Sequence, residues 1–92
     1  MKRDIAETTA LRALTWLLGN DELLPVFLGS TGASLADMRE RAGEAEFLGS
    51  VLDFLMMDDA WVIAFCSASG LEYDAPMAAR AALPGGDVPD WT

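Results

Sequence analysis

The hydrophobic positions of this chain recur with the spacing of α-helices, and strand-like alternation is missing. Glycine or proline follows the apolar segments, and small polar or acidic residues precede them, as at helix ends. We therefore predict an all-α fold: a compact bundle of five to six short helices in one domain over 1–83, with an irregular or disordered tail over 84–92. The predicted helices are 4–18, 22–28, 35–42, 45–57, 60–68 and 75–83.

The segment 45–57 is predicted to be the central helix of the bundle. Its apolar residues cover more than half of a helical wheel, so it must pack against several neighbours. They are Phe47, Leu48, Val51, Leu52, Phe54, Leu55 and Met56. The next helix, 60–68, has one main apolar face, from which Ile63 points away. The residues of that face are Trp61, Val62, Phe65 and Cys66.

The first helix, 4–18, has an apolar face that we expect to be buried, and Trp16 lies on the opposite side. The residues of this face are Ala10, Leu11, Leu14, Leu17 and Leu18. Trp16 is either covered by another helix or the tail, or is an aromatic anchor in a protein interface. Met57 and Ile63 raise the same question, so we take Trp16, Met57 and Ile63 as candidate interface residues.

Small polar residues and glycines predict where several helices begin and end. Pairs typical of a capping box are Asp4 with Glu7 and Ser34 with Asp37. Asn20 or Asp21 is expected to cap the second helix, and Asp58 or Asp59 the fifth. Gly19 or Asn20, Gly29 and Gly70 are expected to end the first, second and fifth helices.

The composition is hydrophobic and acidic, with 52% hydrophobic residues, a mean hydropathy of +0.24 and a formal net charge of −9. No basic residue occurs from Ala42 to Ala79, while seven acids fall there. The excess of negative charge either keeps an oily domain soluble or forms an acidic face for a basic partner. We expect no binding to nucleic acid, because phosphate contacts need clustered lysine and arginine.

We expect no membrane-spanning segment, no membrane partner and no signal peptide from this pattern. The longest uncharged stretch, Leu23 to Ala36, has 14 residues with a proline and two glycines, and a bilayer span needs about 20 apolar residues. Charged residues interrupt the N-terminal segment where a signal peptide would be apolar. With Cys66 as its one cysteine, the protein is expected in the reducing cytoplasm.

Residues for catalysis are scarce, and we expect no enzyme, cofactor or metal. The chain has no histidine, so Ser–His and Cys–His pairs are excluded, and Cys66 lies on an apolar helical face. Asp53 and Asp58 would suit a carboxylate enzyme only if a pocket brought them together around a metal. Asp58 and Asp59 diverge on any helix and are interpreted as caps.

The segment 35–54 has the outline of a helix-turn-helix, with a turn at Gly43. Its second helix would begin with Glu44 and Glu46 and then turn apolar, with no side chain suited to reading a base edge. Because the outline fits but the chemistry does not, a helix-turn-helix-like transcriptional regulator is kept only as the alternative hypothesis. The leading hypothesis is a non-enzymatic protein–protein interaction module that binds a protein partner or itself.

The order of these segments resembles a small family of alphaproteobacterial proteins catalogued as domain of unknown function 3572. The resemblance covers about 5–85 and rests on core and cap positions. They are Trp16-Leu17-Leu18, Phe27-Leu28, Thr31-Gly32, Leu35 with Met38-Arg39, Phe47-Leu48 with Val51 to Leu55, Asp58-Asp59, Phe65-Cys66 and Leu83-Pro84-Gly85. It implies a small, cytoplasmic, all-helical bacterial protein and supplies no activity, ligand or site.

Overall fold

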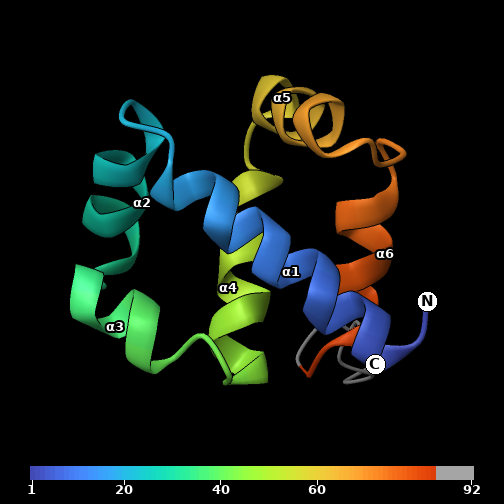
Figure 1. Ribbon diagram of the computed structural model, residues 1–92, viewed down its shortest axis with the longest axis horizontal. Helices are drawn as coiled ribbons and strands as arrows, with labels where there is room; N and C mark the ends of the chain where they lie inside the picture. The colour runs from blue at the N-terminus through green and yellow to red at the C-terminus, as the bar shows by residue number, and fades with distance from the viewer. Residues whose placement is uncertain (85–92) are drawn as a thin grey trace, which may run out of the picture.

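The computed structural model describes residues 1–84, which form six α-helices and no strand (Figure 1). The all-helical fold predicted from the periodicity is confirmed. Pro84 is described, but the rest of the predicted tail, 85–92, lies outside the described residues. The helices are α1 (Arg3–Leu18), α2 (Leu23–Thr31), α3 (Leu35–Glu40), α4 (Ala45–Leu55), α5 (Asp59–Ser69) and α6 (Ala75–Ala82).

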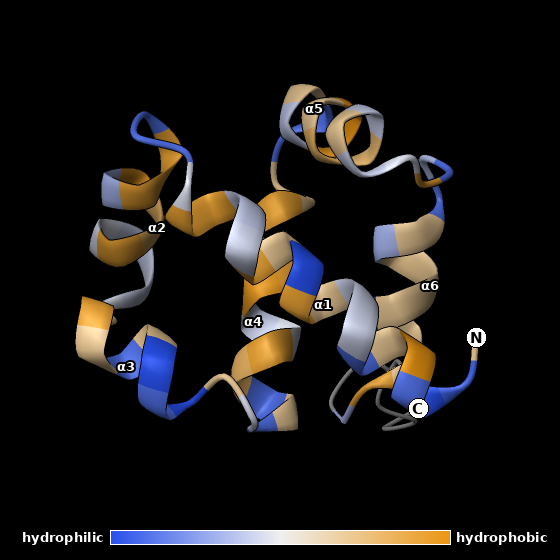
Figure 2. Cartoon of the chain, in the orientation of Figure 1, coloured by the Kyte–Doolittle hydropathy of each residue, from blue (hydrophilic) through white to orange (hydrophobic). Residues whose placement is uncertain are grey.

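Helix α4 lies at the centre of the bundle, as its apolar pattern predicts. Seven of its eleven residues are buried. Helix α1 crosses α4 and packs against both α4 and α6, while α2 and α3 lie together on the side opposite α6 (Figure 1). Helix α5 lies across one end of this arrangement, next to the C-terminus of α4. Apolar residues dominate α4, and polar residues gather at α3 and at the connections beside α5 (Figure 2).

Aromatic rings join α2 to the central helix. Phe27 is fully buried and meets Phe47 and Phe54 of α4 edge to face, with ring centroids 6.2 and 5.2 Å apart. Phe54 also stacks on Trp61 of α5 at 4.8 Å. Such ring pairs add to the free energy gained by burying their area. Phe27 is the one fully buried residue of α2 and makes its deepest contact with the core, beside the partly buried Leu23, Leu24 and Leu28.

The predicted buried face of α1 is partly wrong, because Leu11 and Leu18 are exposed. The helix buries a face rich in small residues instead. Its buried residues are Ala6, Thr9, Ala10, Ala13, Leu14 and Leu17. Alanines allow the α1 backbone to approach α4 and α6 closely, and the hydroxyl of Thr9 is satisfied by donating to the carbonyl oxygen of Ile5 at 2.9 Å. The buried face of α1 is therefore the one whose small side chains allow neighbouring helices to approach closely, and not the one with the most large apolar side chains.

Glycine does not end α2 where the sequence suggests. The helix continues through Gly29 to Thr31 and ends at Gly32, which has a φ of 73° and donates its N–H to the carbonyl oxygen of Leu28. A glycine within a helix is tolerated, whereas the left-handed residue after a helix strongly favours glycine. Helix α5 ends in the predicted way at Gly70, with a φ of 70°.

The predicted caps are confirmed at α3 and α5 and wrong at α1, and at α2 the N-cap residue is Glu22, which follows the predicted Asn20 and Asp21. Ser34 and Asp37 form a complete capping box at α3, and the Asp58 carboxylate accepts the N–H of Ala60 at α5. Asn20 accepts the N–H groups of Glu22 and Leu23. The box expected at Asp4 is missing, because α1 begins at Arg3, with Lys2 before it, and Glu7 instead pairs with Arg3.

Candidate interaction surface

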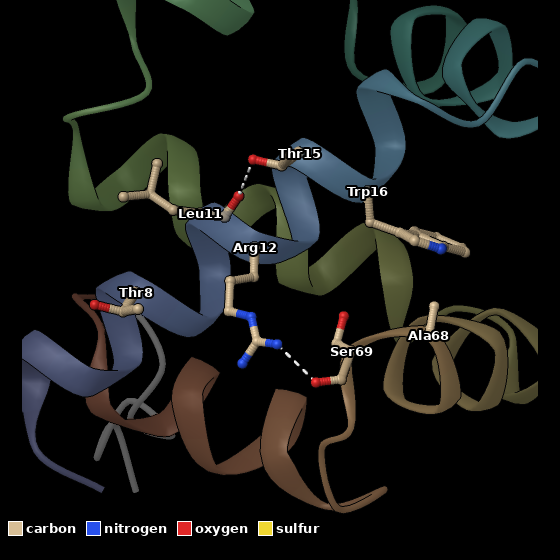
Figure 3. Close-up of a pocket in the computed structure, with 7 residues that line it drawn as sticks. All are labelled: Thr8, Leu11, Arg12, Thr15, Trp16, Ala68 and Ser69. Carbon is tan, nitrogen blue, oxygen red and sulfur yellow. Dashed lines mark hydrogen bonds between the residues drawn. The ribbon is translucent and has the colours of Figure 1, made fainter.

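Trp16 lies at the seam between α1 and α5. Its ring is half-buried and meets Phe65 of α5 edge to face, with centroids 5.8 Å apart. Beside it is an open hollow of about 410 Å³, which Figure 3 shows with Trp16 directed toward α5. The lining residues are Thr8, Leu11, Arg12, Thr15, Trp16, Ala68 and Ser69. Trp16 is thus covered in part by α5 and left open in part.

Three polar side chains of this hollow donate hydrogen bonds within the protein. Arg12 donates from Nη2 to the carbonyl oxygen of Ser69 at 2.6 Å (Figure 3). That carbonyl belongs to the last turn of α5, in which no lysine or arginine occurs. The positive charge of Arg12 at this position interacts favourably with the negative end of the α5 helix dipole. Thr8 and Thr15 donate to the carbonyls of Asp4 and Leu11. The hollow is therefore a stabilised seam between two helices rather than a set of unused polar groups.

A second hollow lies between the first turns of α5 and α6. It has a volume of about 300 Å³, and we call it the α5–α6 groove. Tyr73, which precedes α6, crosses toward α5, where its hydroxyl lies 3.5 Å from the hydroxyl of Ser67. The groove is lined by Met56, Asp59, Val62, Tyr73, Pro76 and Met77.

None of the three candidate residues lines this groove, but Met57 and Ile63 each follow a lining residue in the chain. Met57 follows the lining residue Met56 and is 71% exposed. Ile63 is 48% exposed and lies one helical turn beyond Asp59 on the same side of α5. Phe65, which contacts Trp16, comes two residues later and so points about 160° away from Ile63. Ile63 therefore lies on the groove side of α5, Trp16 contacts the opposite side, and Met57 is next to the groove in sequence.

Sequence reasoning missed two residues of this surface. Tyr73 is 60% exposed and Met77 63% exposed, and both line the groove. Met77 is the one large apolar side chain among the alanines of α6, and Tyr73 is the only tyrosine of the chain. These signals alone do not distinguish a core side chain from an exposed one, because either residue could have faced α1.

Carboxylates flank the groove at both helix starts. Asp58 and Asp59 are exposed at the start of α5, and Glu72 and Asp74 precede α6. Each helix N-terminus contributes only about half a positive charge, so four full negative charges outweigh two dipoles. The nearest base along the chain after α5, Arg80, has a side chain 17% exposed and is paired with Asp53. The surface around the groove is therefore negatively charged.

The residues considered for catalysis have structural roles. Cys66 is fully buried, as predicted, and burial, with a further contribution from the negative charge of Asp74, raises the pKa of its thiol. Asp53 binds Arg80, and Asp58 caps α5. Among residues 1–84, no three side chains of the metal-binding types gather closely enough to hold an ion. In the same range, no helix has the length and apolar character that crossing a membrane requires.

Comparison with protein families matched residues 3–86 to the family described as "Protein of unknown function (DUF3572)". The chain belongs to this family. The resemblance drawn from its core and cap positions is confirmed. No curated protein and no solved structure matched the chain. The description of this family gives no activity, so the evidence for a function is the surface of the protein itself.

Proposed function

We propose that the protein is a non-enzymatic interaction module that binds a protein partner at the α5–α6 groove and the apolar residues beside it. The observation that carries the proposal is that exposed Tyr73 and Met77 line one hollow, with exposed Met57 and Ile63 next in the chain to its lining residues Met56 and Val62. Burying apolar surface yields about 25 cal/mol per Å², so leaving these side chains in water is costly unless a partner covers them. Methionine also adapts its shape to a partner.

A binding role accounts for the rest of the molecule better than catalysis. The chain has no histidine, the commonest general base, and its one thiol is buried with a raised pKa, which disfavours it as a nucleophile. Asp53 and Asp58 are engaged in separate structural contacts. We place the protein in the cytoplasm, where its single cysteine would stay reduced.

The alternative, a helix-turn-helix-like regulator, gains no support from the placement of its second helix. A recognition helix must expose one face to the DNA groove, but α4 is the central helix of the bundle. Its exposed residues include Glu46 and Asp53, whose charge would repel phosphates.

Self-association through the α5–α6 groove is a second form of the interaction hypothesis. Two copies would bring the carboxylates beside each groove together, and like charges across an interface oppose binding. A different protein partner is therefore favoured over a second copy. Sedimentation at micromolar concentration checks this choice, and a monomer is the expected result.

The proposal is tested by affinity capture from the native cell with two matched variants. Ile63→Ser removes an exposed apolar side chain beside the groove, and Leu35→Ser removes one of similar exposure, 52%, on α3. The binding role predicts that a partner captured by wild type and by Leu35→Ser is lost with Ile63→Ser. Equal capture by all three proteins, or no partner from any, would count against the proposed surface.

A further inference from the structure

The α5–α6 groove is suited to the side chains of a partner helix. Its volume of about 300 Å³ lies at the lower limit of small-molecule pockets, and apolar side chains supply most of its lining. A hollow of this size, open to solvent between two helices, accommodates one or two large apolar side chains from a partner. Met56 and Met77 can adjust to the shape of those side chains.

The described fold favours a helix over an extended peptide as the occupant. An added β-strand needs a sheet edge, and residues 1–84 contain no strand. Proline-rich peptides dock on grooves lined by several aromatic rings, and Tyr73 is the one aromatic residue that lines this groove. Phosphorylated or acidic motifs are bound by clustered arginines, and no arginine or lysine among residues 1–84 lines this groove. A helix with apolar side chains at i, i+3 or i+4 and i+7 is therefore the mode that we favour.

The charge around the groove selects the polar face of that helix. Asp59 lines the groove, with Asp58 beside it, and Glu72 and Asp74 flank its other side. No lysine or arginine of the described residues lines the groove, and Arg12 of α1 reaches α5 at its last turn, where it binds the carbonyl oxygen of Ser69. Lysine or arginine beside the apolar stripe of a partner would complement these carboxylates, whereas an acidic partner, a nucleic acid or an anionic membrane would be repelled.

We propose that the α5–α6 groove binds a basic amphipathic helix of a partner protein. The apolar stripe of that helix lies against Met56, Val62 and Met77, and its basic side chains lie near Asp59 and Asp74. This inference rests on the proposed binding role and adds to it the shape and charge of the partner.

The test uses the full-length protein and synthetic peptides about five helical turns long. One peptide places leucine with the helical period and lysine elsewhere, a second has the same composition in scrambled order, and a third has glutamate in place of lysine. Binding is followed by fluorescence anisotropy of the labelled peptide. We expect the periodic basic peptide to bind at least about tenfold more tightly than the other two, and more weakly at high salt.

Matched variants locate the binding. Met77→Lys adds a positive charge within the groove, and Leu35→Lys makes the same change at an exposed position on α3, far from α5 and α6 (Figure 1). We expect Met77→Lys to weaken binding of the basic peptide about tenfold and Leu35→Lys less than about threefold. Asp59→Asn is expected to weaken binding more than Glu40→Gln, which neutralises a carboxylate on α3. Thermal melts of each variant confirm that it is folded.

The outcomes separate this inference from the proposed function. Equal effects of Met77→Lys and Leu35→Lys, or equal binding of the basic, scrambled and acidic peptides, would overturn the basic helix. If a cellular partner were nevertheless lost with Ile63→Ser, the binding surface would stand and only the chemistry of its partner would be wrong. If wild type, Leu35→Ser and Ile63→Ser captured the same proteins, the proposed surface itself would fail.

Discussion

Arg80 of α6 reaches α4, where its Nε lies 2.7 Å from Oδ1 of Asp53. The same guanidinium donates from Nη1 to the carbonyl oxygen of Pro84 at 3.1 Å. It lies against Gly49, where an added Cβ would come within 2.9 Å of Nη1. Gly49 thus leaves the space in which the guanidinium lies while it binds Asp53, one turn further along α4.

Gly49→Ala tests this arrangement when it is made with and without Arg80. In an Arg80→Ala background we expect it to raise the free energy of unfolding by about 1 kcal/mol, the helix preference of alanine over glycine. With Arg80 present we expect almost no gain, because the new Cβ displaces the guanidinium from an ion pair worth up to about 1 kcal/mol. Urea unfolding measures both differences, and the same gain in the two backgrounds would exclude the proposed contact.

Gly29 and Gly32 form a matched pair that tests where α2 ends. Gly29 is helical with open space around its Cβ position, so Gly29→Ala is expected to stabilise the protein by up to about 1 kcal/mol. Gly32 has a φ of 73°, so Gly32→Ala is expected to destabilise it by about 1 kcal/mol. Thermal or urea unfolding gives both values. Opposite signs confirm the helix end at Gly32, and the reverse signs would place it at Gly29.

Phe27 is expected to carry most of the attachment of α2. Phe27→Ala removes a fully buried ring from contact with Phe47 and Phe54 and should cost about 3–5 kcal/mol of unfolding free energy. Val26→Ala, at the neighbouring exposed position, serves as the control and should change stability by less than about 0.5 kcal/mol. Urea unfolding compares them, and similar losses would argue against Phe27 as the main anchor.

Because the thiol of Cys66 is buried, we expect the free energy of unfolding to fall in alkaline solution. Its thiol has an ordinary pKa of 9.0, and burial followed by the charge of Asp74 raises the pKa in the folded protein. Above pH 9 the unfolded chain loses this proton while the folded protein keeps it, so stability falls as pH rises. The slope of this contribution is at most about 1.4 kcal/mol per pH unit. Below pH 9 both states hold the proton, and the contribution is constant.

Urea unfolding at a series of pH values measures this dependence for wild type and Cys66→Ala. The alanine variant should lack the thiol's share of the alkaline slope, although its overall stability is lower. An identical slope in both proteins would show that Cys66 does not titrate on unfolding. Slow reaction of the folded wild type with a thiol reagent at neutral pH would agree with the buried, protonated thiol.

The sequence predicted helix positions well because periodicity and caps act over a few residues. The Ser34–Asp37 box and the Asp58 cap are local hydrogen bonds, so residue spacing alone predicts them. The end of α2 was missed because Gly29 and Gly32 carry the same chemical signal, and only the backbone conformation distinguishes them. Exposed Leu11 and buried Ala13 were missed because the rotation of α1 depends on its contacts with α4 and α6.

The candidate surface depends still more on distant contacts. Ile63 and Met57 could be proposed from a helical wheel, but Tyr73 and Met77 could not, since the position of α6 beside α5 is set by packing. By itself the sequence determined the helical class, the central helix, the acidic charge and the shortage of catalytic groups, which follow from composition and local spacing. Only the tertiary structure decided which apolar residues face water and that Asp59 and Met77 line one groove, because burial arises from segments far apart in the chain.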